Sequence, residues 1–212
     1  MTLLPIFVRL EGQPVLVVGA GSVALSKIES LRAAGAAITV VAPAAVPSVQ
    51  DLAKDGDILW HQRPFIPDDL DGVFLVIAAT NDSDVNRAVY GEARVRNVLC
   101  NAVDDPPNCD FYFGSVVRRG DLQIAISTGG ESPALAQRLR REIDAQLPVG
   151  AGEWLAEIGS VRREIRTVLP ASAARTALLH DLAHLPLCSS PMCSTRQWAR
   201  QTVATLQEEA KA

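Results

Sequence analysis

The segment CNAVDDPPNCDFYFGS, residues 100–115, concentrates side chains that could do chemistry. Asp104 and Asp105 could accept protons, and Cys100 and Cys109 could bind a metal together with a carboxylate. The nine-residue offset between the cysteines matches no compact zinc motif, and a cysteine within a buried strand usually packs as a small apolar residue. We therefore predict no metal here. For the aspartates, a proton-accepting site and a polar turn both stay open, because Asp-Pro pairs favour turns.

A second chemical motif lies nearer the N-terminus. Gly19, Gly21 and Ala24 form the pattern G-x-G-x-x-A directly after the apolar run PVLVV. The first glycine permits a tight turn, the second lets backbone approach a pyrophosphate, and the small third residue lets a helix pack closely on the strand. Backbone N–H groups at the helix start, at Ser22 and Val23, would receive the pyrophosphate. We predict dinucleotide binding here, with a tight turn that binds no ligand as the alternative.

Further cofactor contacts are expected where two other strands end. The dinucleotide fingerprint normally has an acidic residue after the second strand to hold the adenosine ribose, but VVAPAA, residues 40–45, contains none. Backbone groups at Pro43 and Ala44 would replace it, and the lack of an arginine there favours NAD over NADP. Thr80, in the segment AATND, should line the same crevice at the end of a later strand.

These residues depend on a regular alternation of strands and helices. Residue patterns predict five strands, at residues 14–18, 37–43, 57–62, 72–80 and 98–103, of which the first two are expected to be buried. The run at 72–80 is the most hydrophobic and is predicted to be central. In the helix after the glycine loop, Val23, Ile28, Leu31 and Ala34 are expected to form the apolar face, and Gly35 to end it. The alternation predicts an α/β fold with a Rossmann-like, doubly wound parallel sheet.

The pattern changes after residue 110. FYFGSVV and LQIAIS predict two strands joined by the turn RRGD, and four helical segments follow from Ser132 onward. We predict an NAD-binding domain at 1–113, a small β-containing linking element at 114–147 and a helical C-terminal domain at 148–212.

Composition limits the classes of function. The 212 residues carry a formal net charge of −4, which argues against a nucleic-acid partner. No apolar run approaches the roughly 20 residues needed to span a bilayer, and the N-terminus has no basic stretch typical of a secretory signal. The four cysteines are too few for a disulfide scaffold at this length. We therefore expect a cytoplasmic protein without a membrane partner.

Several longer segments resemble one family. The opening LPIFVRLEGQPVLVVGAGSVALSKIESLRAAGA, the strand end LVIAATND and the stretch CNAVDDPPNCDFYFGSVVRRGDLQIAISTGGESPALAQRLR are similar to precorrin-2 dehydrogenases. These include stand-alone bacterial enzymes, the N-terminal half of siroheme synthase and a fungal enzyme that also inserts iron. The resemblance covers about residues 3–150 closely. Its most specific part is N-x-V-D-x-P, followed by an aromatic strand and STGG-x-SP-x-L.

The resemblance implies an activity and roles for residues. Members use NAD⁺ to oxidise precorrin-2 to sirohydrochlorin, and in some members the same cleft inserts Fe²⁺ to give siroheme. Asp104 matches the essential aspartate, with a role as general base or in positioning pyrrole N–H groups, and Asn101 would share that wall of the cleft. The strands after the Rossmann domain and the helix that follows them build a homodimer in the family. At 212 residues, we expect the dehydrogenase-type unit without a fused methyltransferase.

The segment STGGESP, residues 127–133, fits a substrate that carries acetate and propionate groups. Ser127, Thr128, Gly129 and Ser132 would bind those carboxylates, with free N–H groups ahead of a helix that Ser132 caps. A plain helix cap is the alternative. Arg138, on that helix, is expected to add a contact to the polyanion.

Other interpretations remain. One is a regulatory module that senses NAD without catalysis, although such modules generally keep the acidic residue missing here. Another is a dehydrogenase of an unrelated small substrate. His180 and His184 stand at i and i+4, near Cys188 and Cys193, and could grip a metal, but no catalytic carboxylate motif accompanies them and we predict none.

Overall fold

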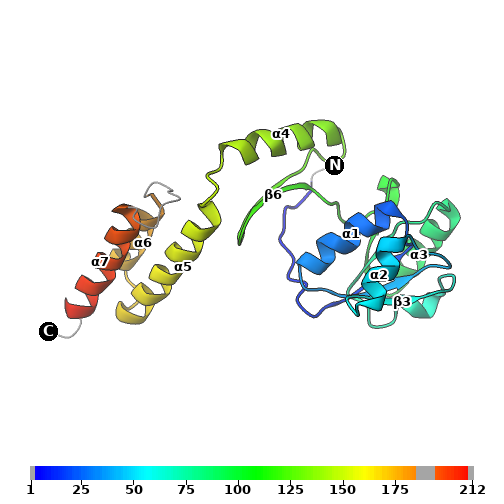
Figure 1. Ribbon diagram of the computed structural model, residues 1–212, viewed down its shortest axis with the longest axis horizontal. Helices are drawn as coiled ribbons and strands as arrows, with labels where there is room; N and C mark the ends of the chain where they lie inside the picture. Colours follow the sequence, from blue (N-terminus) through cyan, green and yellow to red (C-terminus); the bar gives the residue numbers. More distant parts are fainter. Residues whose placement is uncertain (1–2, 185–193, 210–212) are drawn as a thin grey trace. The chain divides into compact units, whose positions relative to one another are not determined.

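The computed structural model describes residues 3–184 and 194–209 (Figure 1). The chain divides into two compact units, Met1–Phe113 and Gly114–Ala212. Each unit has its own secondary structure and packing, and each is described by itself.

The first unit is built on a five-stranded sheet in the order β3-β2-β1-β4-β5. All the neighbouring strands are parallel, which confirms the predicted doubly wound fold. Val18, at the end of β1, pairs with Val41 of β2 and with Ala78 of β4, so these three strands end at the same level. The strands are β1 (Pro14–Val18), β2 (Ala37–Val41), β3 (Leu59–His61), β4 (Leu75–Ala78) and β5 (Leu99–Ala102).

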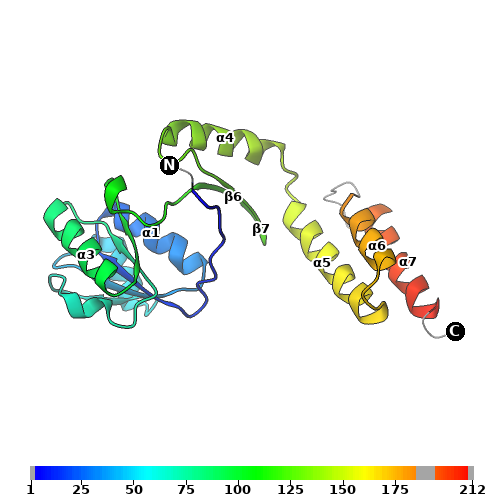
Figure 2. The same ribbon diagram turned by 180° about the vertical axis from the view of Figure 1, so that it is seen from behind.

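Helices cover both faces of this sheet (Figures 1 and 2). On one face, α1 (Ser22–Ala33) and α2 (Pro47–Lys54) pack over the alternate side chains of β1 and β2. On the other, α3 (Ser83–Val95) and the 3-10 helix Pro67–Leu70 cover β4 and β5. All four residues of β4 are buried, as a strand covered on both faces requires.

The apolar face of α1 differs from the prediction at its first position. Ile28 and Leu31 are buried as expected, but the side chain of Val23 is 48% exposed. Val23 lies in the first turn of α1, directly after the glycine loop. The predicted end of α1 is confirmed, because Gly35 has φ +75° and its N–H bonds to the Arg32 carbonyl at 2.9 Å.

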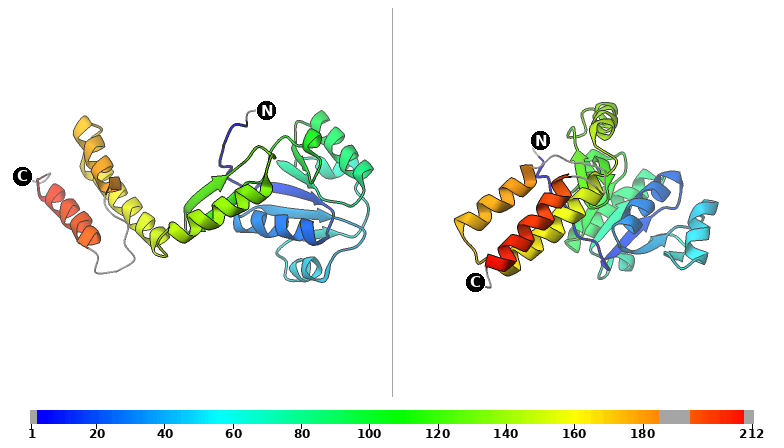
Figure 3. Two further views of the ribbon diagram at one scale, coloured as in Figure 1. Left: turned by 90° about the horizontal axis from the view of Figure 1, so that it is seen from above. Right: turned by 60° about the vertical axis from the view of Figure 1, so that its left-hand side comes forward.

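The second unit begins with an antiparallel hairpin of β6 (Ser115–Arg119) and β7 (Leu122–Ile126). Gly120 supplies the positive φ that a two-residue hairpin loop requires. The first helix, α4 (Pro133–Gln146), packs along this hairpin (Figure 3). The hairpin and this helix agree with the elements expected from the sequence.

Three further helices complete the second unit: α5 (Ala151–Val168), α6 (Ala173–His184) and α7 (Ser194–Glu209). Buried Val161 and Ile165 of α5 and Leu182 of α6 form their common core, against which Trp198 of α7 packs. Among the described helices of the chain, none is long and apolar enough to cross a membrane.

The two glycines of α5 give a test of this packing. A Cβ at Gly152 would lie 2.9 Å from the Gly120 backbone nitrogen, whereas a Cβ at Gly159 would meet only an Arg163 side-chain nitrogen, at 3.4 Å. We expect Gly152→Ala to lower the free energy of unfolding by about 1–3 kcal/mol, because helix and hairpin must separate. Gly159→Ala should raise it by up to about 1 kcal/mol through helix propensity. Urea unfolding followed by circular dichroism measures both, and equal effects of the two substitutions would contradict the close contact.

Candidate functional site

The glycine loop leaves β1 in a conformation that only glycine adopts easily. Gly19 has φ +104°, and its N–H donates to the Val41 carbonyl at 2.9 Å. A Cβ on Gly19 would lie 2.7 Å from the Ala79 carbonyl carbon. The missing side chain therefore lets the end of β1 approach the end of β4.

Gly21 lacks a side chain for a different reason. It is the N-cap of α1, without any side-chain cap hydrogen bond, and a Cβ there would have no protein atom within 4 Å. Ser22 and Val23, the first residues of the helix, are exposed, and Ala24 is fully buried against the sheet. The loop therefore leaves open space in front of the helix N-terminus, and this space fits a pyrophosphate.

The end of β2 forms the next part of this edge. Pro43 and Ala44 are exposed, and the segment is held by the Trp60 indole N–H, which donates to the Ala42 carbonyl at 3.0 Å. The Val46 N–H donates to the Ala20 carbonyl at 3.0 Å and ties the segment to the glycine loop. Backbone groups at Pro43 and Ala44 are thus placed beside the loop.

Thr80 follows β4 and is fixed by a residue that the sequence analysis missed. The Thr80 hydroxyl lies 2.7 Å from Oδ1 of Asn86, and Nδ2 of Asn86 donates to the Thr80 carbonyl at 3.0 Å. Asn86 is buried, with 6% of its surface exposed. Its only sequence signal is a polar residue on the side of α3 that must face the sheet. We infer that Asn86 shapes the loop that follows β4.

Asp104 lies in the turn that directly follows β5. Its side chain is exposed and its φ is +60°, a left-handed conformation uncommon outside glycine but tolerated by Asp and Asn. The turn is closed by the Asp105 N–H, which donates to the Ala102 carbonyl at 3.2 Å. The Val103 N–H donates to the Ala78 carbonyl at 2.9 Å and ties the turn to the end of β4. The structure thus contains the predicted turn, and it presents the Asp104 carboxylate at the same sheet edge as the glycine loop.

Lys27 of α1 brings a positive charge to Asp104, and the sequence analysis missed it. Its ammonium nitrogen lies 4.3 Å from the centre of the Phe113 ring, and the residue is partly buried. Burial lowers the pKa of Lys27 below its usual value, and the charge of Asp104 partly offsets this. The only sequence signal for Lys27 is its place one helical turn after Val23, which periodicity assigns to the apolar face of this helix.

Asn101 and the two cysteines serve internal contacts. Asn101 is buried, and its Nδ2 donates to the Phe111 carbonyl at 2.7 Å. Burial raises the pKa of the Cys100 thiol to about 12, while Cys109 donates to the Ala102 carbonyl at 3.0 Å. The Cys100 thiol is a small buried group within the strand, and the partly buried Cys109 thiol bonds within the turn, in line with the packing role expected for them. A substrate contact by Asn101 stays a prediction.

The predicted carboxylate-binding residues lie in the second unit. Ser132 caps α4 by accepting from the Leu135 N–H at 3.3 Å, with Pro133 at the first helical position, which confirms the predicted cap. Ser127 accepts from the Gly129 N–H and Thr128 from the Ser132 N–H, at 3.1 and 3.2 Å. These bonds already pair some of the N–H and hydroxyl groups of residues 127–132 within the protein. A role in binding substrate stays a prediction.

Arg138 projects from the exposed surface of α4. Its Nε lies 3.3 Å from Oε1 of Glu142, one helical turn further along. An exposed pair of this kind contributes well under 1 kcal/mol, so a stronger anion could displace Glu142.

Within residues 3–184 and 194–209, no three His, Cys, Asp or Glu side chains come together to hold a metal ion. His180 and His184 lie on α6. Cys188 and Cys193 fall outside the described residues.

Two family models match this chain. Residues 6–115 match the family model described as "Putative NAD(P)-binding", and residues 119–146 match the model described as the central part of sirohaem biosynthesis proteins. The chain belongs to this NAD(P)-binding family. The first match spans the sheet and its helices, and the second spans the hairpin loop, β7 and α4.

Similar proteins carry related names. Siroheme synthase 1 of Yersinia enterocolitica is 46% identical over 166 residues, which are 78% of this chain and 35% of that protein. Siroheme synthase 1 of Cronobacter sakazakii is 47% identical over 162 residues, or 76% of this chain and 34% of that protein. The chain thus spans about a third of the length of these relatives.

A solved structure matches almost the whole chain. SirC, a precorrin-2 dehydrogenase, superposes with a TM-score of 0.78 at 25% identity, over 96% of this chain and 100% of that one. Together with the named relatives, this likeness confirms the family resemblance predicted from the sequence.

The glycine loop generates a paired prediction. Gly21→Ala should weaken NAD⁺ binding at least about tenfold while changing the free energy of unfolding by less than about 1 kcal/mol, because the added methyl group enters only the ligand space. Gly19→Ala should instead lower that free energy by about 1–3 kcal/mol, because its methyl group meets the Ala79 carbonyl. Calorimetric titration with NAD⁺ and thermal unfolding measure the two quantities. Wild-type NAD⁺ affinity in Gly21→Ala would contradict the assignment of the open space.

The buried ammonium of Lys27 gives a pH-dependent prediction. Between its lowered pKa and 10.5, the folded protein releases the Lys27 proton before the unfolded chain does, so this group adds stability as pH rises. The free energy of unfolding of wild type should therefore increase relative to that of Lys27→Met as pH rises from neutral towards 10.5. Denaturant unfolding across this interval measures the difference. Lys27→Arg is the control, because arginine stays charged and its difference from Lys27→Met should remain constant.

Proposed function

We propose that this protein is an NAD-dependent precorrin-2 dehydrogenase that produces sirohydrochlorin in siroheme biosynthesis. The family model supports the cofactor, and the siroheme synthase relatives and the likeness to SirC support the substrate. The observation that carries the proposal is the position of Asp104, at the same sheet edge as the open glycine loop and within reach of the charge of Lys27.

The cofactor would lie along that edge. The N–H groups of Ser22 and Val23 would bind the pyrophosphate in the space left by Gly21, and Gly19 would keep the loop close to β4. Backbone at Pro43 and Ala44 would meet the adenosine ribose, and the absence of an arginine there supports NAD over NADP.

Further contacts are proposed where β4 ends. Thr80, held by Asn86, would line the crevice in which the nicotinamide end lies. When bound, NAD⁺ supplies the hydride acceptor.

Asp104 would take part in the chemical step. Oxidation of precorrin-2 removes a hydride and a proton, and the Asp104 carboxylate would accept the proton and pass it to solvent, to which it is exposed. The ammonium of Lys27 attracts this carboxylate and opposes its movement away from the crevice. The left-handed φ of Asp104 holds the side chain at the tip of the turn.

Substrate carboxylates require cationic and N–H partners. We propose this role for Ser127, Thr128, Gly129, Ser132 and Arg138, with Asn101 supporting the wall of the cleft. The exposed Arg138–Glu142 pair is weak enough to yield to a polyanion. Iron insertion, which some family members perform with Fe²⁺ as substrate, is a second activity to assay on the same protein.

We also propose a cytoplasmic homodimer. A two-stranded hairpin is marginally stable alone, and β6–β7 has both outer edges unpaired in its sheet. Pairing with the same hairpin of a second chain would satisfy one of those edges in each chain. Residues 114–147 would then be the dimerisation element and 148–212 a separate helical domain.

The test replaces Asp104 without disturbing its backbone. Asp104→Asn keeps a residue that tolerates positive φ but removes the proton acceptor, so we expect turnover of precorrin-2 with NAD⁺ to fall by about 10²–10⁴-fold while thermal stability stays the same. Formation of sirohydrochlorin and NADH is followed by absorbance. Asp105→Asn is the matched control, with activity expected within a few-fold of wild type.

Each other outcome has a definite meaning. Equal turnover by wild type and Asp104→Asn would refute the role of Asp104. Binding of NAD⁺ without any turnover by wild type would instead favour a regulatory module that senses NAD.

A further inference from the structure

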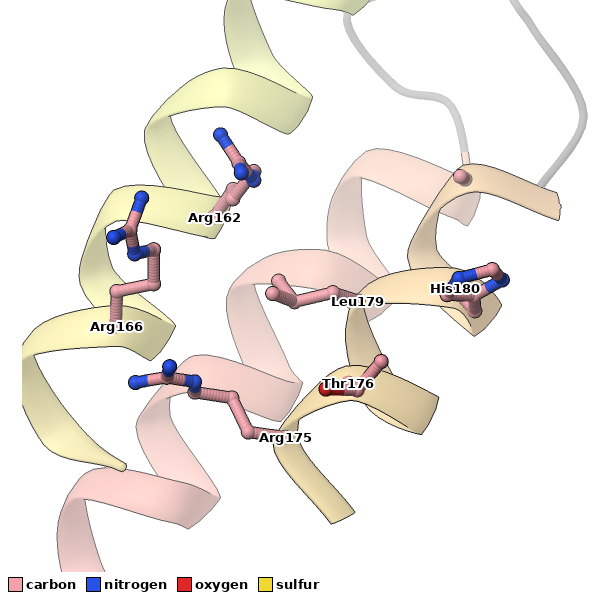
Figure 4. Close-up of a pocket in the computed structure, with 7 residues that line it drawn as sticks. Arg162, Arg166, Arg175, Thr176, Leu179 and His180 are labelled. Atoms are coloured by element: carbon pink, nitrogen blue, oxygen red, sulfur yellow. The ribbon is translucent and has the colours of Figure 1, made fainter. Parts of the chain in front are cut away.

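A pocket with strong positive charge lies between α5 and α6 in the second unit (Figure 4). Its volume is about 500 Å³, within the range of sites that hold small molecules. It is lined by Arg162 and Arg166 from α5 and by Arg175, Thr176, Leu179 and His180 from α6.

Three arginines converge on this pocket from two helices. Arg162 and Arg166 stand on successive turns of α5, and Arg175 extends from α6 towards them (Figure 4). Like charges at i and i+4 destabilise a helix by about 0.2–0.5 kcal/mol. The first turn of α6, which contains Arg175 and Thr176, adds the positive end of its helix dipole.

These guanidinium groups lack the carboxylate partners that Arg119 and Arg138 of the same unit have. Arg119 pairs with Asp144 at 2.7 Å, and Arg138 pairs with Glu142. Across the described part of the second unit, no ion pair involves any of the three pocket arginines. Arg175 donates through Nη1 to the Leu169 carbonyl at 2.9 Å, which leaves its other donors and its charge uncompensated.

Within α5, no acidic residue stands one helical turn from Arg162 or Arg166 to compensate their charge. Residues three and four positions from Arg162 and Arg166 include no Asp or Glu. A cluster of like charges that costs stability and has no carboxylate partner among the described residues is suited to an anion from outside.

The pocket also has an apolar wall. Leu179 extends from α6 towards α5 in Figure 4 and packs against the helical core of the unit. A ligand that fills this space would place several anionic groups on the arginines and an apolar body against Leu179.

We propose that the pocket between α5 and α6 binds a small polycarboxylate with an apolar body, with carboxylates on Arg162, Arg166 and Arg175. The choice of a carboxylated tetrapyrrole rests on the proposed function, whose substrate and product carry such groups. Arginine suits this ligand because its planar fork bonds a carboxylate through two parallel hydrogen bonds.

The test titrates the full chain with uroporphyrin, a stable tetrapyrrole with carboxylates on all its side chains, and follows porphyrin fluorescence. Wild type should bind uroporphyrin at a site that depends on these arginines. The double substitution Arg162→Gln, Arg166→Gln should weaken the affinity of that site at least about tenfold. The control is Arg163→Gln, which removes the same charge from α5 at a residue that does not line the pocket, and its binding should stay within about twofold of wild type.

A second variant and a measurement of helicity distinguish loss of binding from loss of structure. Arg166→Glu should abolish binding at the same site, and circular dichroism should show wild-type helicity for every variant. A double variant that binds uroporphyrin as wild type does would overturn the inference. Competition by tripolyphosphate as strong as by benzenehexacarboxylate would overturn the assignment to carboxylates.

Failure here can be told apart from failure of the proposed function. Turnover of precorrin-2 depends on Asp104 and the glycine loop, so its absence would leave the arginine-dependent binding unchanged. Conversely, loss of the uroporphyrin site in the double variant should leave NAD⁺ binding unchanged.

Discussion

The first unit depends on one row of backbone hydrogen bonds along the edge where its strands end. Gly19 donates to the Val41 carbonyl, Ala79 to the Val18 carbonyl and Val103 to the Ala78 carbonyl, at 2.8–2.9 Å. These bonds join the ends of β2, β1, β4 and β5 in succession. They require the close approach that Gly19 permits, because a side chain there would occupy the position of the Ala79 carbonyl. The loops at this edge can therefore act together as one site.

In both units, the second constraint is whether a positively charged side chain has an opposite charge nearby. At the sheet edge, the half-buried ammonium of Lys27 is stabilised by the Phe113 ring and by Asp104, and in turn biases the position of that carboxylate. In the helical unit, Arg162, Arg166 and Arg175 gather without such compensation from the described residues. Lys27 thus has an opposite charge nearby, whereas the three arginines are open to an anion from outside the chain.

Much of the fold was predictable from short-range patterns. The five parallel strands, the glycine loop, the end of α1 at Gly35 and the cap at Ser132 each depend on a few neighbouring residues whose backbone preferences are strong. Val23 was assigned to the apolar face because periodicity alone cannot show which residues of a helix lie against the sheet. Asn86 and Lys27 were missed for a related reason, since a single polar residue on a helix has no pattern and its role depends on what lies opposite.

The sequence by itself therefore determined the α/β class, the dinucleotide loop and the family, because turn chemistry, strand hydrophobicity and the N-x-V-D-x-P motif are local properties. It left Asp104 between a turn residue and a proton acceptor. The tertiary structure shows the turn, and the role as proton acceptor stays our proposal. Asp104 lies in this turn with a backbone φ of +60°. Because β5 is parallel to β4, the turn stands at the same sheet edge as the glycine loop, where Gly21 leaves open space. Only the fold could bring these charges near each other, because Lys27 and Asp104 are far apart in the chain and lie on different elements of the first unit.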